Sequence, residues 1–171
     1  MNKEVLLAHP WFGPCLAALI AIPLALLVHR IGGVVLKRVT RSTPALHAML
    51  LRIQAIARIV LPLVALQMVW QAAPDDLRFV NSVRHLNGLL LIAATTWLAA
   101  RAVNGFADGV LAQHPYDVTD NLRARRVLTQ TRVLARTANS MLLVAGGALM
   151  LMTFPGARQV GASLLASAGV I

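Results

Sequence analysis

Four long apolar segments separated by charged stretches constrain this chain more than any other feature. They cover residues 11–36, 56–73, 86–103 and 138–154. A helix needs about 20 mainly apolar residues to cross a bilayer whose hydrocarbon core is about 30 Å thick. Hydrophobic residues make up 58% of the chain and charged residues only 13%, whereas a typical soluble domain is roughly 45–50% apolar. We therefore predict an all-α, polytopic membrane protein with four transmembrane helices and the start of a fifth helix.

The predicted fifth helix covers residues 160–171 and is rich in Gly, Ala and Ser. On a helix, Ala162, Ala166 and Gly169 form one stripe. In lipid, helices associate through small residues that let their backbones approach closely. The stripe predicts close helix neighbours, either in other copies of the chain or in an ordinary hairpin. The run rises only about 18 Å, so we expect it to belong to a longer helix or to enter the membrane without crossing it.

The first apolar segment has a second interpretation, which is a cleaved signal peptide. Residues 15–28 have the length of a signal-peptide core. However, no small-x-small cleavage pattern follows them, and the basic residues lie after the apolar core rather than before it. A retained transmembrane helix explains the segment better.

The charges are unevenly distributed along the chain, which has 16 Lys and Arg residues against 6 Asp and Glu and a net charge of +10. The basic residues lie between apolar segments, as topology signals do, and not on one polar face as in a nucleic-acid-binding domain. We therefore expect no nucleic-acid partner. With the N-terminus outside, twelve basic residues are cytoplasmic. Four remain outside: Lys3, Arg78, Arg84 and Arg158.

A basic amphipathic helix is predicted for residues 122–136, with Thr119 or Asp120 as its N-cap. No helix-breaking residue separates it from the fourth apolar segment. Its arginines suit contact with anionic lipid headgroups. The predicted headgroup contacts are Arg125, Arg126, Arg132 and Arg136.

Residues that carry chemistry are scattered, so we predict that the chain is not an enzyme. The five histidines follow no metal-ligand spacing, and Ser163 and Ser167 have no base nearby in the sequence. The single cysteine, Cys15, excludes an internal disulfide and a cysteine-cluster metal site. We expect no metal, no catalytic residue and no cofactor, although a bound phospholipid is compatible with such a membrane protein. The acidic residues lie near segment ends, which disfavours a transporter.

The sequence from about residue 121 onward resembles the small-conductance mechanosensitive ion channel family. The resemblance lies in the runs at residues 125–134, 151–159 and 163–171. More narrowly, it is to the longer members, which carry extra transmembrane helices before the shared membrane core. These members imply three divisions of this chain: peripheral sensor-type helices at 1–111, a cytoplasmic basic connection at 112–136, and the fourth span, turn and pore helix at 137–171.

The resemblance implies a homo-oligomer, heptameric in this family, in the bacterial inner membrane with a periplasmic N-terminus. It implies a channel that opens under membrane tension and releases ions and small osmolytes on hypo-osmotic stress. The implied pore-helix residues are Gly161, Ala162, Ser163, Ala166 and Gly169. The implied periplasmic turn consists of Phe154, Pro155, Gly156 and Arg158. The family's apolar constriction and cytoplasmic vestibule would follow Ile171. A non-conducting membrane scaffold, or a fragment of a longer protein, remains the alternative.

Overall fold

A computed structural model describes residues 11–113 and 122–169 of the chain. Within these ranges all regular secondary structure is helical, which confirms the predicted all-α fold class. The predicted N-cap at Thr119 or Asp120 lies outside the described residues. The elements in chain order are α2 (Phe12–Val39), the 3₁₀ turn η1 (Thr40–Ser42), α3 (Pro44–Ala72), α4 (Val80–Ala112), α5 (Leu122–Met152), the 3₁₀ turn η2 (Pro155–Ala157) and α6 (Arg158–Gly169).

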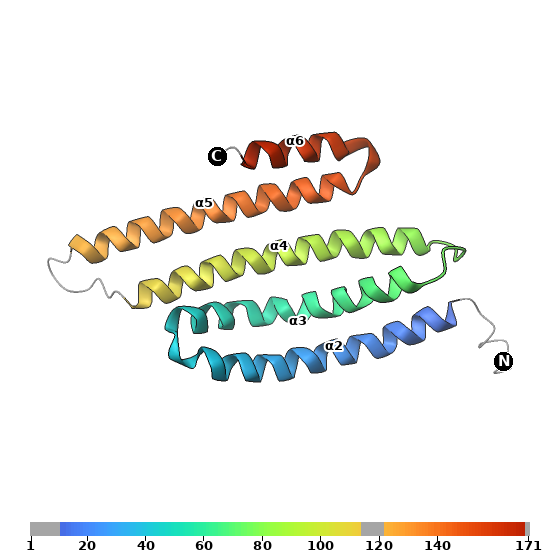
Figure 1. Cartoon of the computed structure of the whole chain (residues 1–171), viewed down its shortest axis with the longest axis horizontal. Helices are drawn as coiled ribbons and strands as arrows, with labels where there is room; N and C mark the ends of the chain where they lie inside the picture. Colours follow the sequence, from blue (N-terminus) through green and yellow to red (C-terminus); the bar gives the residue numbers. More distant parts are fainter. Residues whose placement is uncertain (1–10, 114–121, 170–171) are drawn as a thin grey trace.

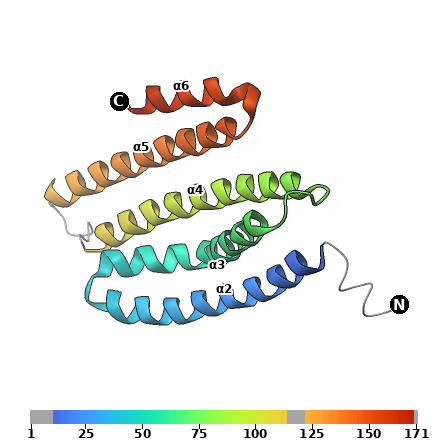
Figure 2. The ribbon, with the colours of Figure 1, turned by 45° about the vertical axis from the view of Figure 1, so that its right-hand side comes forward.

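The helices lie side by side in a single row, in the order in which they occur in the chain (Figure 1). Consecutive helices run in opposite directions, and a rotated view shows the same row (Figure 2). Each described helix packs only against the helices that precede and follow it. The row therefore has two open faces, and none of its helices is enclosed on all sides.

Four of the helices are long enough and apolar enough to cross a membrane. Large apolar side chains project from the row, including Leu19, Met68 and Leu143, whose exposed fractions are 70%, 68% and 66%. Apolar surface on this scale is unfavourable in water and favourable in lipid. The chain is therefore a multi-pass membrane protein, as predicted. The candidate spans are Phe12–Ser42, Pro44–Ala72, Val80–Ala112 and Arg126–Met152.

The helices are longer than the apolar segments that predicted them. The second apolar segment begins at residue 56, but α3 is continuous from Pro44. Likewise α4 extends beyond residues 86–103 at both ends. Hydropathy locates the part of a helix suited to lipid, whereas the helix continues as long as its polar side chains can reach water or headgroups. Because α5 is continuous, the predicted division between residues 136 and 137 falls inside a helix.

Close backbone packing joins α3 and α4 through two glycines of α4. A Cβ atom added to Gly105 would lie 2.7 Å from the Cα atom of Met49, and one added to Gly109 would lie 2.9 Å from the carbonyl oxygen of Ala45. Such distances are too short for real side-chain contacts. The two glycines are four residues apart, the spacing at which transmembrane helices pack closely. Only glycine therefore fits at these two positions of α4 without a shift of α3.

Further along the same pair of helices, a buried apolar cluster and a buried amide add to the packing. The cluster consists of Ile56 and Val60 of α3 and Ala94 of α4. The amide is that of Asn87, whose Nδ2 donates to Gln67 Oε1 at 2.6 Å and to the Leu63 carbonyl oxygen at 3.1 Å. Interhelical hydrogen bonds of this kind fix the register of two helices in lipid.

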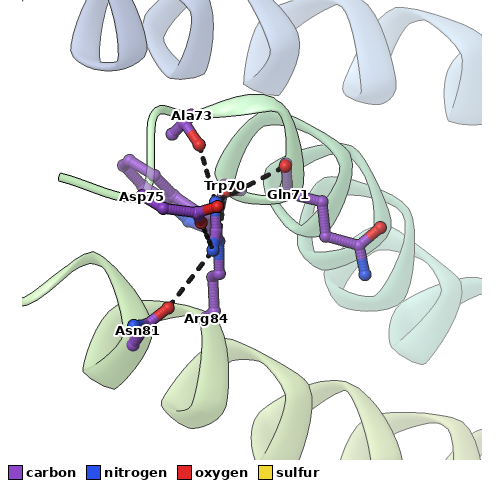
Figure 3. A network of polar contacts seen from close by, with 6 residues as sticks. All are labelled: Trp70, Gln71, Ala73, Asp75, Asn81 and Arg84. Atoms are coloured by element: carbon purple, nitrogen blue, oxygen red, sulfur yellow. Dashed lines mark hydrogen bonds and ion pairs between the residues drawn. The ribbon is translucent and has the colours of Figure 1, made fainter. Parts of the chain in front are cut away.

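A single arginine closes the turn between α3 and α4 (Figure 3). Arg84 Nε donates to the Trp70 carbonyl oxygen at 2.7 Å, and its Nη2 donates to the Ala73 carbonyl oxygen at 2.6 Å. Its Nη1 pairs with Asp75 and donates to Asn81 Oδ1 at 3.2 Å. The last carbonyls of a helix have no partner within the helix. Arg84, on α4, therefore caps the C-terminus of α3 and ties the hairpin together.

Candidate functional site

The residues predicted to act together lie in the hairpin of α5 and α6. The turn at Pro155 and Gly156 forms η2, after which α6 folds back beside α5 (Figure 1). Phe154 precedes the turn, and its ring meets the ring of His85 of α4 edge-on, with the centroids 4.9 Å apart. Arg158 is exposed at the first position of α6. The predicted turn residues are thus contiguous at one end of the row.

One side of α6 packs against α5. Gly161 is buried, and a Cβ atom added to it would lie 2.6 Å from the carbonyl oxygen of Ala148 and 2.6 Å from Cγ of Met152. Leu165 and Ala168 follow on the same side of the helix and are half-buried. Gly161 therefore lets the backbones of α5 and α6 come close within one chain.

The predicted small-residue stripe lies on a different side of α6. Ala162, Ala166 and Gly169 are all exposed in the single chain. Ser163 is exposed beside them, and its hydroxyl donates to the Gln159 carbonyl oxygen of its own helix at 2.9 Å. The structure thus divides the five predicted pore-helix residues: Gly161 packs within the chain, and the other four remain on an open surface.

The arginines predicted to contact lipid headgroups lie along the first half of α5. Arg126, Arg132 and Arg136 are exposed, and none pairs with an acidic side chain in the part of the chain that the structure describes. The side chain of Arg125 lies outside that part. An exposed basic helix of this kind remains available to anionic headgroups.

An apolar hollow of about 510 Å³ lies between α4 and α5. Its walls include Val103, Phe106 and Val110 of α4, and Leu134 and Ala138 of α5. This hollow could not be predicted from the sequence, because a gap between two helices depends on how far apart their backbones lie. The small residues at this interface, such as Ala102, Ala107 and Ala135, were its only signal in the sequence.

Two contacts hold α4 and α5 together beside this hollow. Asn139 Nδ2 donates to Asn104 Oδ1 at 2.7 Å, while Asn139 Oδ1 is buried without a partner in the described structure. Further along, a Cβ atom added to Gly146 would lie 2.6 Å from Cγ2 of Thr96. The α4–α5 interface thus combines two close contacts with a hollow.

The described residues form no cluster suited to a metal ion. No cluster of three His, Cys, Asp or Glu side chains suited to a metal occurs in residues 11–113 and 122–169. The hydroxyls of Ser163 and Ser167 both bond to carbonyl oxygens of their own helix. Helices α4, α5 and α6 instead present packing surfaces and exposed basic side chains.

Comparison of the chain with known protein families, characterised proteins and solved structures gives no match.

Proposed function

We propose that this chain is a subunit of a membrane-tension-gated ion channel that releases ions and small osmolytes under hypo-osmotic stress. The observation that carries the proposal is the exposed small-residue side of α6, formed by Ala162, Ala166 and Gly169. A different side of α6, the one that contains Gly161, already packs against α5. In lipid, a second small-residue surface on the same helix suits a second helix neighbour.

The single-row architecture favours a pathway between copies rather than within one copy. Each described helix contacts only its chain neighbours, so one copy cannot surround an aqueous path. In the proposed assembly α6 of each copy stands near a common axis, and the exposed stripe of one copy faces α6 of the next. The number of copies that we propose, seven, comes from the family resemblance.

The same architecture allows membrane tension to shift the equilibrium between a closed and an open state. A state with a larger area in the membrane plane gains free energy in proportion to tension. A ligand or a field shifts an equilibrium only through a difference between the states, and a row of helices with both faces open can supply a difference in area. In the proposal, α2, α3 and α4 form the outer part of the subunit, and the α5–α6 hairpin moves relative to them.

We also propose that the protein lies in the bacterial inner membrane with its N-terminus on the periplasmic side. The support is the distribution of basic residues, twelve on one side and four on the other, because cytoplasmic loops carry an excess of Lys and Arg. The exposed Arg126, Arg132 and Arg136 would then lie at the cytoplasmic leaflet.

Patch-clamp recording from liposomes that contain the purified chain tests the proposal. We expect suction to open discrete conductances, and we expect Ala166→Leu to raise the threshold tension because a larger side chain hinders sliding between adjacent α6 helices. Ala168→Leu provides the matched control, because Ala168 lies on the side of α6 that faces α5. Silent membranes, at tensions up to rupture, would favour the non-conducting scaffold instead.

A further inference from the structure

A basic hollow of about 360 Å³ lies between α2 and α3, well away from α6. Four of the described residues line it: Leu26, His29 and Arg30 of α2, and Arg58 of α3. Three of the four are basic, and they come from two different helices. The hollow therefore brings hydrogen-bond donors and positive charge together between α2 and α3.

The charges of this hollow have no counter-charge within the described chain. The acidic residues there are Asp75, Asp76 and Asp108, and none lines the hollow. Asp75 pairs with Arg84, and Asp108 pairs with Arg52 at 2.5 Å. Arginines without partners are unfavourable close to lipid unless an anion approaches them. The hollow thus differs from the sites of Arg52 and Arg84, each of which pairs with a carboxylate.

An apolar groove of about 210 Å³ adjoins the hollow. It runs between α2 and α3 past Gly32, Gly33 and Leu61, and His29 lines both the groove and the hollow. A Cβ atom added to Gly32 would have no atom within 4 Å, so this part of the groove has open space. The ligand that suits both features has an anionic group joined to an apolar chain.

The depth of the hollow matches a headgroup region. Phe12, the first residue of α2, and Arg30 are eighteen residues apart, so the helix rises about 27 Å between them. The hydrocarbon core is about 30 Å thick. With Trp11 and Phe12 at one interface, Arg30 and its neighbours reach the other, where phosphate groups lie.

We propose that the hollow and the groove together bind one anionic phospholipid. Arg30 and Arg58 donate to its phosphate, since guanidinium groups bind phosphate strongly through charge-assisted hydrogen bonds. His29 stands at the junction, and one acyl chain lies along the groove past Gly32. An anionic headgroup is favoured over a zwitterionic one because the described lining is basic and includes no acidic residue. This site does not depend on the proposed channel function.

Native mass spectrometry of the purified full chain in detergent tests the site with three probes: phosphatidylglycerol, phosphatidylcholine and inorganic phosphate. We expect phosphatidylglycerol to bind most tightly. Arg30→Gln/Arg58→Gln should weaken its binding about tenfold. Arg38→Gln/Arg41→Gln removes the same charge from exposed residues outside the hollow and should change binding less than about twofold. An Arg30→Lys/Arg58→Lys variant should retain most of the binding, because it keeps the charge.

The groove is tested by Gly32→Leu, which places a side chain in the open space. Its control is Gly147→Leu, at a position in α5 that is equally open. We expect only Gly32→Leu to weaken phosphatidylglycerol binding, with helicity and elution volume unchanged for both variants. Equal losses from the two arginine pairs would overturn the proposal, because they would indicate attraction by net charge alone. Displacement of the lipid by equimolar inorganic phosphate would also overturn it, in favour of a simple anion site.

Discussion

The α3–α4 and α4–α5 interfaces share helix α4 but are built differently. Between α3 and α4, Gly105 and Gly109 bring the backbones into contact, and Arg84 closes the turn. Between α4 and α5, an asparagine pair and the contact of Gly146 with Thr96 stand beside a hollow of about 510 Å³. This difference indicates that α3 and α4 form one firm hairpin, whereas α5 is attached to it more loosely.

This contrast indicates which part of the proposed channel moves when it opens. Close-packed interfaces resist displacement because each shift breaks many van der Waals contacts. An interface with a hollow has fewer such contacts to lose when its helices shift. In the proposed channel, the α5–α6 hairpin therefore moves relative to the α3–α4 hairpin, whose two helices stay together. The following substitutions test the two interfaces against each other.

The largest effect is expected at Gly109. Gly109→Leu forces a side chain against the backbone of Ala45, and overpacking of this kind costs about 3 kcal/mol. The free energy of unfolding, measured by circular dichroism during titration with dodecyl sulfate, should fall accordingly. Gly88→Leu is the matched control, because a Cβ atom at Gly88 of the same helix meets no atom within 4 Å. Equal stability of the two variants would contradict the inference that α3 and α4 form a firm hairpin.

The next effect is expected at Arg84. Arg84→Gln removes the donors that reach the Trp70 and Ala73 carbonyl oxygens, which should lower the free energy of unfolding by about 2 kcal/mol. Arg78→Gln serves as the control, since Arg78 lies in the same turn, is exposed and lies 5.9 Å from the centroid of the Phe79 ring. Similar stabilities for both variants would mean that the carbonyl caps contribute little.

A smaller effect is expected at Gly146. Gly146→Leu meets the side chain of Thr96 rather than a backbone, and a side chain can rotate away, so the cost should be about 1 kcal/mol. The neighbouring Gly147→Leu, in open space, should be nearly neutral in the same titration. If Gly146→Leu proved as destabilising as Gly109→Leu, the α4–α5 interface would be as firm as the other, and the comparison would fail.

The smallest effect is expected at Asn139. Asn139→Ala removes the hydrogen bond to Asn104, which should cost about 0.6 kcal/mol, an average value for such bonds in lipid. Asn87→Ala removes two bonds from a buried side chain of the firm hairpin and should cost more. The reverse order in unfolding titrations would contradict the proposed ranking of the interfaces.

Hydropathy was sufficient to predict the number of spans and their approximate centres. It was insufficient for their ends, because α3 and α4 continue beyond the apolar segments through residues such as Arg52 and Asp108, which pair at the helix surface. The spacing of Gly105 and Gly109 is visible in the sequence. The residues that face them, Ala45 and Met49, depend on the register of two helices, which no local pattern specifies.

The candidate site was predicted in part. Periodicity placed Ala162, Ala166 and Gly169 on one stripe, and all three are exposed on α6. It did not separate Gly161 from them, because the side of α6 that faces α5 is decided by the turn and by Ala148 and Met152. The hollows beside α5 and between α2 and α3 arise from helix spacing, so they were beyond sequence reasoning.

The most direct measurement is thiol cross-linking between copies in native membranes. In a Cys15→Ala background, which removes the single natural cysteine, Ala166→Cys and Ala168→Cys are each treated with a short bismaleimide and analysed by denaturing electrophoresis. We expect a ladder of linked copies for Ala166→Cys, on the exposed side of α6, and almost none for Ala168→Cys, on the side that faces α5. Equal linking at both positions, or none at either, would contradict it.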